Sequence, residues 1–220
     1  MSLTWLTHRA APVAILALPM VAAQPLVPRA TASDRQVLIL SPAQDDDRLA
    51  STREAIAFWN RTLAELDLPP RLTETALVVA SPSSRVLENY ARRIWQQAGR
   101  LPAGVAGPTP PPELTGLAAD IVVFLSKQEL MSFAWPLASS TRFFVAISAD
   151  AASPPHHATT LRNVVAHELG HTLGLVHNGD PAALLCGPCR SPFMGFDEGQ
   201  RFLPLTPMDH TRLRELYAAQ

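Results

Sequence analysis

Three histidines lie at positions in the sequence that let their side chains meet at one point. His167 and His171 are four residues apart in a stretch where apolar residues recur at helical spacing. Both side chains therefore project from one face of a helix, about one turn apart. Gly174 comes where this helix must end, and a residue without a Cβ adopts a left-handed turn there at little cost. The turn brings His177 back toward the other two, which predicts a metal site with three imidazole ligands.

The residue types favour one catalytic zinc ion at this site. Imidazole nitrogens suit zinc, and no carboxylate-rich shell is present to favour magnesium or calcium. Three neutral nitrogen ligands leave the fourth tetrahedral position for water, as in catalytic rather than structural zinc sites. Glu168 directly follows the first histidine, and its carboxylate can accept a proton from that water as a general base. The pattern predicts hydrolysis by a zinc-activated water.

The full pattern is HExxHxxGxxH. From the frequencies of His, Glu and Gly in this chain, it would arise by chance with a probability on the order of 10⁻⁵. The pattern matches the signature of the metzincins, a clan of zinc metallopeptidases, and the chain resembles the matrixins within that clan. This resemblance implies a zinc-dependent endopeptidase that hydrolyses peptide bonds in a protein or peptide substrate.

The resemblance also assigns roles outside the histidine pattern. Met194, within the sequence SPFMG, is similar to the methionine that metzincins place in a tight turn beneath the metal. Residues 55–60 and 209–217 look like the first and last helices of matrixins. Asn178 departs from the serine that matrixins have after the third histidine. By the same resemblance, an extended substrate would pair with an edge strand within residues 133–140.

Hydrophobic periodicity predicts the elements that position the site. Short apolar runs predict strands at residues 37–40, 72–80, 120–125 and 142–147, and helical spacing predicts helices that begin after Asp45 and at Ser83. A Pro- and Gly-rich stretch at 101–114 predicts a surface loop. Together with the resemblance, this gives one α+β domain over residues 24–220. We expect a twisted mixed β-sheet with the long first helix on one face, the active-site zinc helix on the other, and a C-terminal helix.

The first 23 residues resemble an export signal. A positive flank at Arg9 precedes a short apolar stretch and a small-residue cleavage site, so we expect cleavage near Ala23 or Gln24. The apolar stretch is too short for a membrane span, which predicts a mature chain without one, secreted or periplasmic. A formal net charge of −1 with scattered basic residues argues against nucleic acid as a partner. We expect a monomer.

Cys186 and Cys189 form the sequence CGPC, which leaves other readings open. In an exported protein, two cysteines this close are typical of a local disulfide, but CGPC is also the redox motif of thioredoxins and could contribute to a second metal site. One alternative function is therefore a thiol-disulfide oxidoreductase. A second alternative is a non-catalytic binding module that zinc stabilises, although a purely structural site does not need Glu168.

Overall fold

The computed structural model describes residues 34–97, 107–137, 141–150, 158–187 and 202–218. Five strands form one sheet in the order β2-β1-β3-β5-β4. Neighbouring strands are parallel, except that β4 runs antiparallel to β5, so the predicted mixed sheet is confirmed. The strands are β1 (Arg35–Ser41), β2 (Leu72–Val79), β3 (Ile121–Leu125), β4 (Phe133–Pro136) and β5 (Phe143–Ile147).

The central strands are continuously apolar because both faces of the sheet are covered. Every residue of β3 and β5 is buried, as expected for parallel strands between two layers. Alternate residues serve two separate cores. Val123 and Val145 belong to the core that contains helices α1 (Arg48–Glu65), α4 (Ala158–Thr172) and α5 (Pro207–Tyr217). Val122 and Phe144 belong to the core under α2 (Ser84–Gln97).

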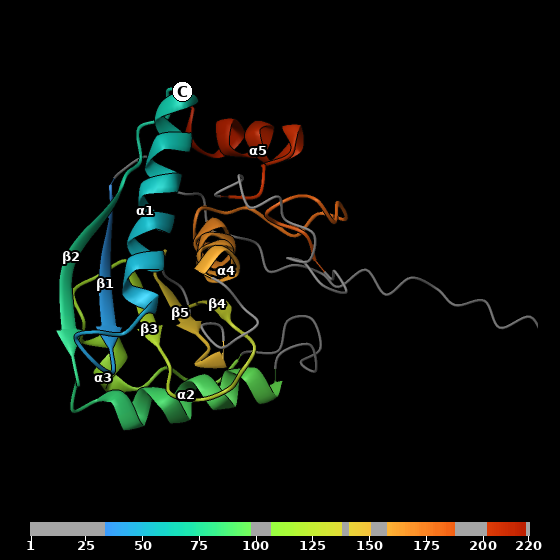
Figure 1. The fold of residues 1–220 in the computed structure, drawn as a ribbon. Helices are drawn as coiled ribbons and strands as arrows, with labels where there is room; N and C mark the ends of the chain where they lie inside the picture. The colour runs from blue at the N-terminus through green and yellow to red at the C-terminus, as the bar shows by residue number, and fades with distance from the viewer. Residues whose placement is uncertain (1–33, 98–106, 138–140, 151–157, 188–201, 219–220) are drawn as a thin grey trace, which may run out of the picture.

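The helices differ from the expectation in one respect. The first helix, α1 (Arg48–Glu65), and the histidine-bearing helix, α4 (Ala158–Thr172), pack against each other on the same face of the sheet (Figure 1). The prediction that they cover opposite faces is wrong; α2 (Ser84–Gln97) covers the other face instead. An apolar stripe shows that a helix packs on a sheet, but it does not indicate which face.

Two shorter helices complete the described fold. A single turn, α3 (Pro112–Thr115), lies at the end of the stretch predicted as a loop. The predicted C-terminal helix is α5 (Pro207–Tyr217), which begins with a capping box between Thr206 and Asp209. None of the helices in the described residues has the length and apolar character needed to cross a membrane.

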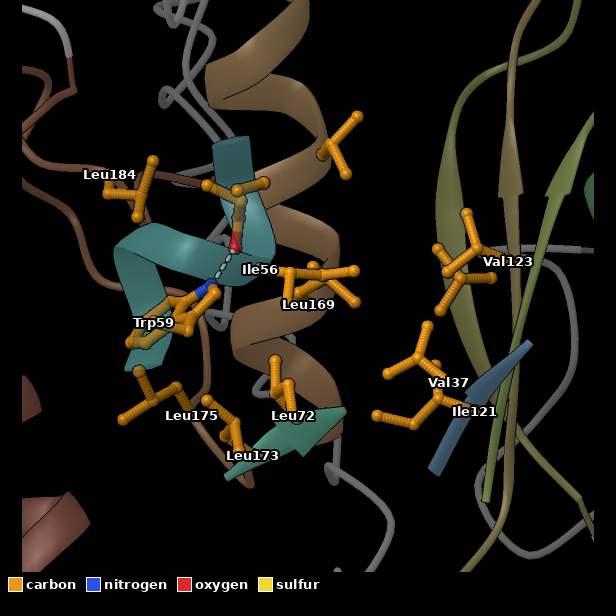
Figure 2. Close-up of a cluster of buried hydrophobic side chains, with 14 of the residues drawn as sticks. Val37, Ile56, Trp59, Leu72, Ile121, Val123, Leu169, Leu173, Leu175 and Leu184 are labelled. Atoms are coloured by element: carbon orange, nitrogen blue, oxygen red, sulfur yellow. Dashed lines mark hydrogen bonds between the residues drawn. The ribbon is translucent and has the colours of Figure 1, made fainter. Parts of the chain in front are cut away.

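Trp59 holds α1 against α4. Its indole is fully buried, and Nε1 donates a hydrogen bond to the backbone carbonyl of Ala166, 2.8 Å away (Figure 2). A Cβ at Gly170 would lie 2.9 Å from Cζ2 of this ring, so the glycine lets the two helices approach closely. Gly170 is a variable position in the HExxHxxGxxH pattern, and the close packing of α1 on α4 explains the glycine there.

Arg48 anchors the start of α1 to the sheet. Its Nη1 donates to the carbonyls of Ser126 and Ser148, at the carboxyl ends of β3 and β5, over 2.6 and 3.0 Å. Asp46 pairs with this buried guanidinium at 2.7 Å and also accepts a hydrogen bond from the Arg48 backbone N–H. The acidic stretch thus marks the helix start, as predicted, with one carboxylate neutralising a buried cation.

Replacing Trp59 by alanine should lower the free energy of unfolding by about 3–5 kcal/mol, because it removes a fully buried ring and its hydrogen bond. Trp95 is the matched control, since its side chain on α2 is 42% exposed and its truncation should cost about 1 kcal/mol or less. Urea unfolding of the metal-loaded variants measures both values. Equal losses would contradict this account of the α1 and α4 contact.

Candidate metal centre

Helix α4 ends where the sequence predicts that it must. Gly174 has a φ of 88°, in the left-handed region that glycine adopts without strain. The Leu175 N–H donates to the carbonyl of Gly170 over 3.1 Å, and the Gly174 N–H donates to that of His171 over 3.0 Å. This pair of bonds is a Schellman motif. It satisfies the last carbonyls of the helix and directs the chain back toward the histidine face.

The structure brings the three predicted ligands together. The Nε2 atoms of His167, His171 and His177 lie 3.1 Å from one another in every pair. Burial differs among them, because His167 is buried whereas His177 is exposed. Among the described residues, these three form the one cluster of potential metal ligands.

In two of the rings, hydrogen bonds made by Nδ1 determine whether the converging Nε2 atom carries a proton or a lone pair. Nδ1 of His167 lies 2.7 Å from the carbonyl oxygen of Leu184, and Nδ1 of His171 lies 2.9 Å from that of Leu175. A carbonyl can only accept, so each Nδ1 carries the proton and donates it. In a neutral imidazole the Nε2 atom then presents a lone pair. Converging lone pairs repel each other unless a cation lies between them.

This donor set fits zinc. Zinc takes imidazole nitrogens at about 2.0–2.1 Å in a tetrahedral arrangement, which separates neighbouring ligands by about 3.3 Å. The observed separations of 3.1 Å are close to this value. A hydrogen bond from the second ring nitrogen to a carbonyl is also the usual way in which proteins orient a metal-binding histidine. His167, His171 and His177 can therefore hold one ion.

Burial keeps these imidazoles neutral. It lowers the pKa of His167 to about 4 and the pKa of His171 to about 3, and it also lowers the pKa of the more exposed His177. A neutral ring is the form that binds a metal. The cluster is therefore ready to coordinate a cation at neutral pH without first losing protons.

Glu168 lies beside the cluster and against the edge strand. It is 7% exposed, and burial raises the pKa of its carboxyl to about 8, while a hydrogen bond from the backbone of Ala134 in β4 lowers it. An isolated carboxylate is costly to bury. Such a residue in a site is typical of catalytic acids and bases.

The other residues singled out in the sequence have mixed outcomes. Met194 and Cys189 lie outside the described residues, so the methionine turn and the disulfide stay predictions. Cys186 is 3% exposed and is not a free thiol. It lies next to Asn178 in a short parallel bridge.

Several groups that shape the site are backbone atoms without a sequence signal. The carbonyls of Leu175 and Leu184 orient two of the rings, and the N–H of Ala134 contacts Glu168. Any residue type can supply such a group, so only the folded chain identifies them.

Comparisons with known proteins cover the part of the chain that holds this site. A family model described as Matrixin matches residues 83–218, more than half of the chain. The archaemetzincin from Methanopyrus kandleri is similar in structure, with a TM-score of 0.42 and 18% identity over 86% of this chain and 98% of that chain. A chain in a structure of a chaperone-substrate complex is similar with a TM-score of 0.39 and 16% identity, over 78% of this chain and 29% of that one. No curated protein matches the sequence.

Lowering the pH from about 6.5 to 4.5 should destabilise the metal-free protein. In this range an unfolded chain protonates its histidines, whereas the three site histidines resist protonation in the folded chain because their pKa values are lowered. Stability falls wherever the unfolded state binds more protons as the pH drops. Glu168 has the opposite effect on stability, because its raised pKa makes the folded chain retain a proton. The three histidines outweigh this single carboxyl.

Thermal unfolding with excess chelator, at constant ionic strength, measures this effect. The Tm should fall across the range, and it should fall less steeply in a His171→Gln variant, which lacks one of the titrating groups. A Tm that is constant or rises toward pH 4.5 would contradict the burial of neutral imidazoles.

Proposed function

Because the chain belongs to the matrixin family of zinc metallopeptidases, we propose that it is an endopeptidase with His167, His171 and His177 as zinc ligands and Glu168 as general base. The observation that carries the proposal is the convergence of three Nε2 atoms, each 3.1 Å from the others, beside a buried carboxyl. Three protein ligands leave room for a further ligand in a tetrahedral site.

His167, His171 and His177 would hold the zinc, which would supply Lewis-acid chemistry by activating a water and polarising a carbonyl oxygen. Glu168 directly follows His167 on α4. A cation bound beside it would favour the ionised carboxyl against the effect of burial, and this carboxylate would accept the proton of the attacking water. The same carboxyl then gives this proton to the amine that leaves when the peptide C–N bond breaks. The carboxylate is regenerated, so each turnover consumes one water and one peptide bond.

The edge strand supports a peptide substrate. β4 lies at one end of the sheet and pairs only with β5 among the described strands. In this antiparallel pair the Leu137 N–H donates to the carbonyl of Arg142 over 2.9 Å, which makes alternate residues face β5. The backbone of Ala134 therefore faces away from β5, consistent with its hydrogen bond to Glu168. An extended peptide along this edge would bring its backbone to the general base.

The two alternative functions have less support. A non-catalytic module stabilised by zinc gives no role to a buried Glu168, whose burial opposes its ionisation. A thiol-disulfide oxidoreductase needs an accessible, reactive thiolate, and Cys186 is buried. We propose that Cys186 and Cys189 form a local disulfide in the loop after the third histidine.

We also propose that residues 1–23 direct export and are removed, and that residues 24–220 act as one monomeric catalytic domain. Mass spectrometry of the secreted protein should find Gln24 or a near neighbour at the N-terminus. A second processed form that lacks β1 would contradict this proposal.

A Glu168→Gln variant should retain its zinc content and its fold while turnover falls by about 10² or more, because the amide keeps the size of the side chain but cannot act as a base. The assay is cleavage of a mixed peptide library by the zinc-loaded protein, with mass spectrometry of the products. Internal peptide bonds should be cut by the wild type, and a zinc chelator should abolish the cleavage.

Two controls accompany this variant. Glu215→Gln, at an exposed position on α5, should cleave at the wild-type rate. His171→Ala should lose both zinc and activity, in contrast to Glu168→Gln. Wild-type turnover by purified Glu168→Gln protein would rule out Glu168 as the base.

A further inference from the structure

The three ligand rings are not positioned in the same way. His167 and His171 each donate a hydrogen bond from Nδ1 to a backbone carbonyl. Within the part of the chain that the structure describes, His177 makes no such bond, and its ring nitrogens contact only the other two rings, through Nε2. A different contact must therefore set the orientation of this ring.

Gly187 makes that contact. A Cβ placed on Gly187 would lie 2.6 Å from Cγ, 2.7 Å from Cδ2 and 2.8 Å from Nδ1 of His177. Distances this short to three adjacent ring atoms mean that the imidazole packs directly against the backbone of the glycine. Any side chain at position 187 would displace the ring or the backbone that carries it.

Two backbone hydrogen bonds keep His177 and Gly187 together. The N–H of Asn178 donates to the carbonyl of Leu185 over 2.8 Å, and the N–H of Gly187 donates to the carbonyl of Asn178 over 2.9 Å. These bonds flank the parallel bridge between Asn178 and Cys186. The ring and the glycine cannot move apart unless this ladder breaks.

The segment 183–187 is also fixed from outside. The N–H of Leu184 donates to the carbonyl of Pro204 over 2.9 Å, and the carbonyl of Leu184 accepts the bond from His167. The Asn178 side chain donates over 3.2 Å to Oδ2 of Asp209, a buried residue in the capping box of α5. The segment 183–187 thus contacts two of the three ligands, His167 and His177, and backbone hydrogen bonds fix it near both of them.

We infer that Gly187 is a positioning residue for His177: its missing side chain lets the imidazole pack on the backbone in the orientation that aims Nε2 at the other two ligand nitrogens. This packing takes the place of the Nδ1 hydrogen bond that orients His167 and His171. The glycine of the CGPC sequence therefore serves the metal centre. The inference rests on the proposed role of His177 as a zinc ligand and does not depend on peptidase activity.

The test compares two glycines in the same region. Gly187→Ala adds a methyl group against the His177 ring, whereas Gly179→Ala adds the same group where no atom lies within 4 Å. Zinc affinity is measured by competition with a chromophoric chelator, and the visible absorption spectrum of the Co²⁺-substituted protein reports ligand geometry. We expect Gly187→Ala to weaken zinc binding about tenfold or more and to alter the Co²⁺ spectrum, while Gly179→Ala leaves both unchanged.

A double-substitution cycle separates positioning from a general structural effect. In a His177→Ala background the ring is absent, so Gly187→Ala should change zinc affinity by less than about twofold. If Gly187→Ala alone fails to fold, the double variant should regain the fold, because the space of the ring becomes free. Wild-type affinity and spectrum in Gly187→Ala, an equal loss in the His177→Ala background, or a double variant that stays unfolded would each overturn the inference.

The readouts also distinguish this inference from the proposed function. A wild-type protein that binds zinc but cleaves no peptide would overturn the endopeptidase proposal and leave the affinities of the glycine variants interpretable. A wild-type protein that cleaves peptides, combined with an unaffected Gly187→Ala variant, would overturn only the role of Gly187.

Discussion

The close packing of α1 on α4 around Trp59 is the constraint on which the site depends. The ligand-bearing helix has to bury one side in the core and present the other to a metal, and the indole fixes its rotation by a direct hydrogen bond to the carbonyl of Ala166. Gly170 permits the approach because a Cβ there would collide with the ring. Leu169 and Leu173 then pack into the core (Figure 2), so His167 and His171 face outward together.

Assembly of the metal centre opposes folding in the absence of a cation. Burial removes water from the imidazoles and from the carboxyl of Glu168, which disfavours their charged forms. Proton donation to backbone carbonyls leaves lone pairs facing each other at 3.1 Å. The surrounding core must hold this arrangement, and a bound cation converts the same geometry from repulsive to attractive. Metal binding and stability of the region are coupled for this reason.

Much of the fold follows from local patterns in the chain. The apolar runs locate β1, β3 and β5, and the Pro- and Asp-containing cap locates α5, because periodicity and capping depend on neighbours a few residues apart. The assignment of α1 and α4 to opposite faces fails because both helices carry an apolar stripe that fits either face. Their shared face is decided by Trp59 and Gly170, residues 111 positions apart that meet only in the folded chain.

The same division holds within the site. Ligand spacing on a helix, the position of Gly174 and the carboxylate beside the first histidine are local features, and they predict a zinc site and a candidate base from the sequence alone. The orientation of each ring is decided by tertiary contacts. Leu184 reaches His167, Ala134 reaches Glu168, and Gly187 packs on His177. These contacts use backbone atoms or a missing side chain, which no residue pattern reveals, because their effect depends on where the rest of the chain places them.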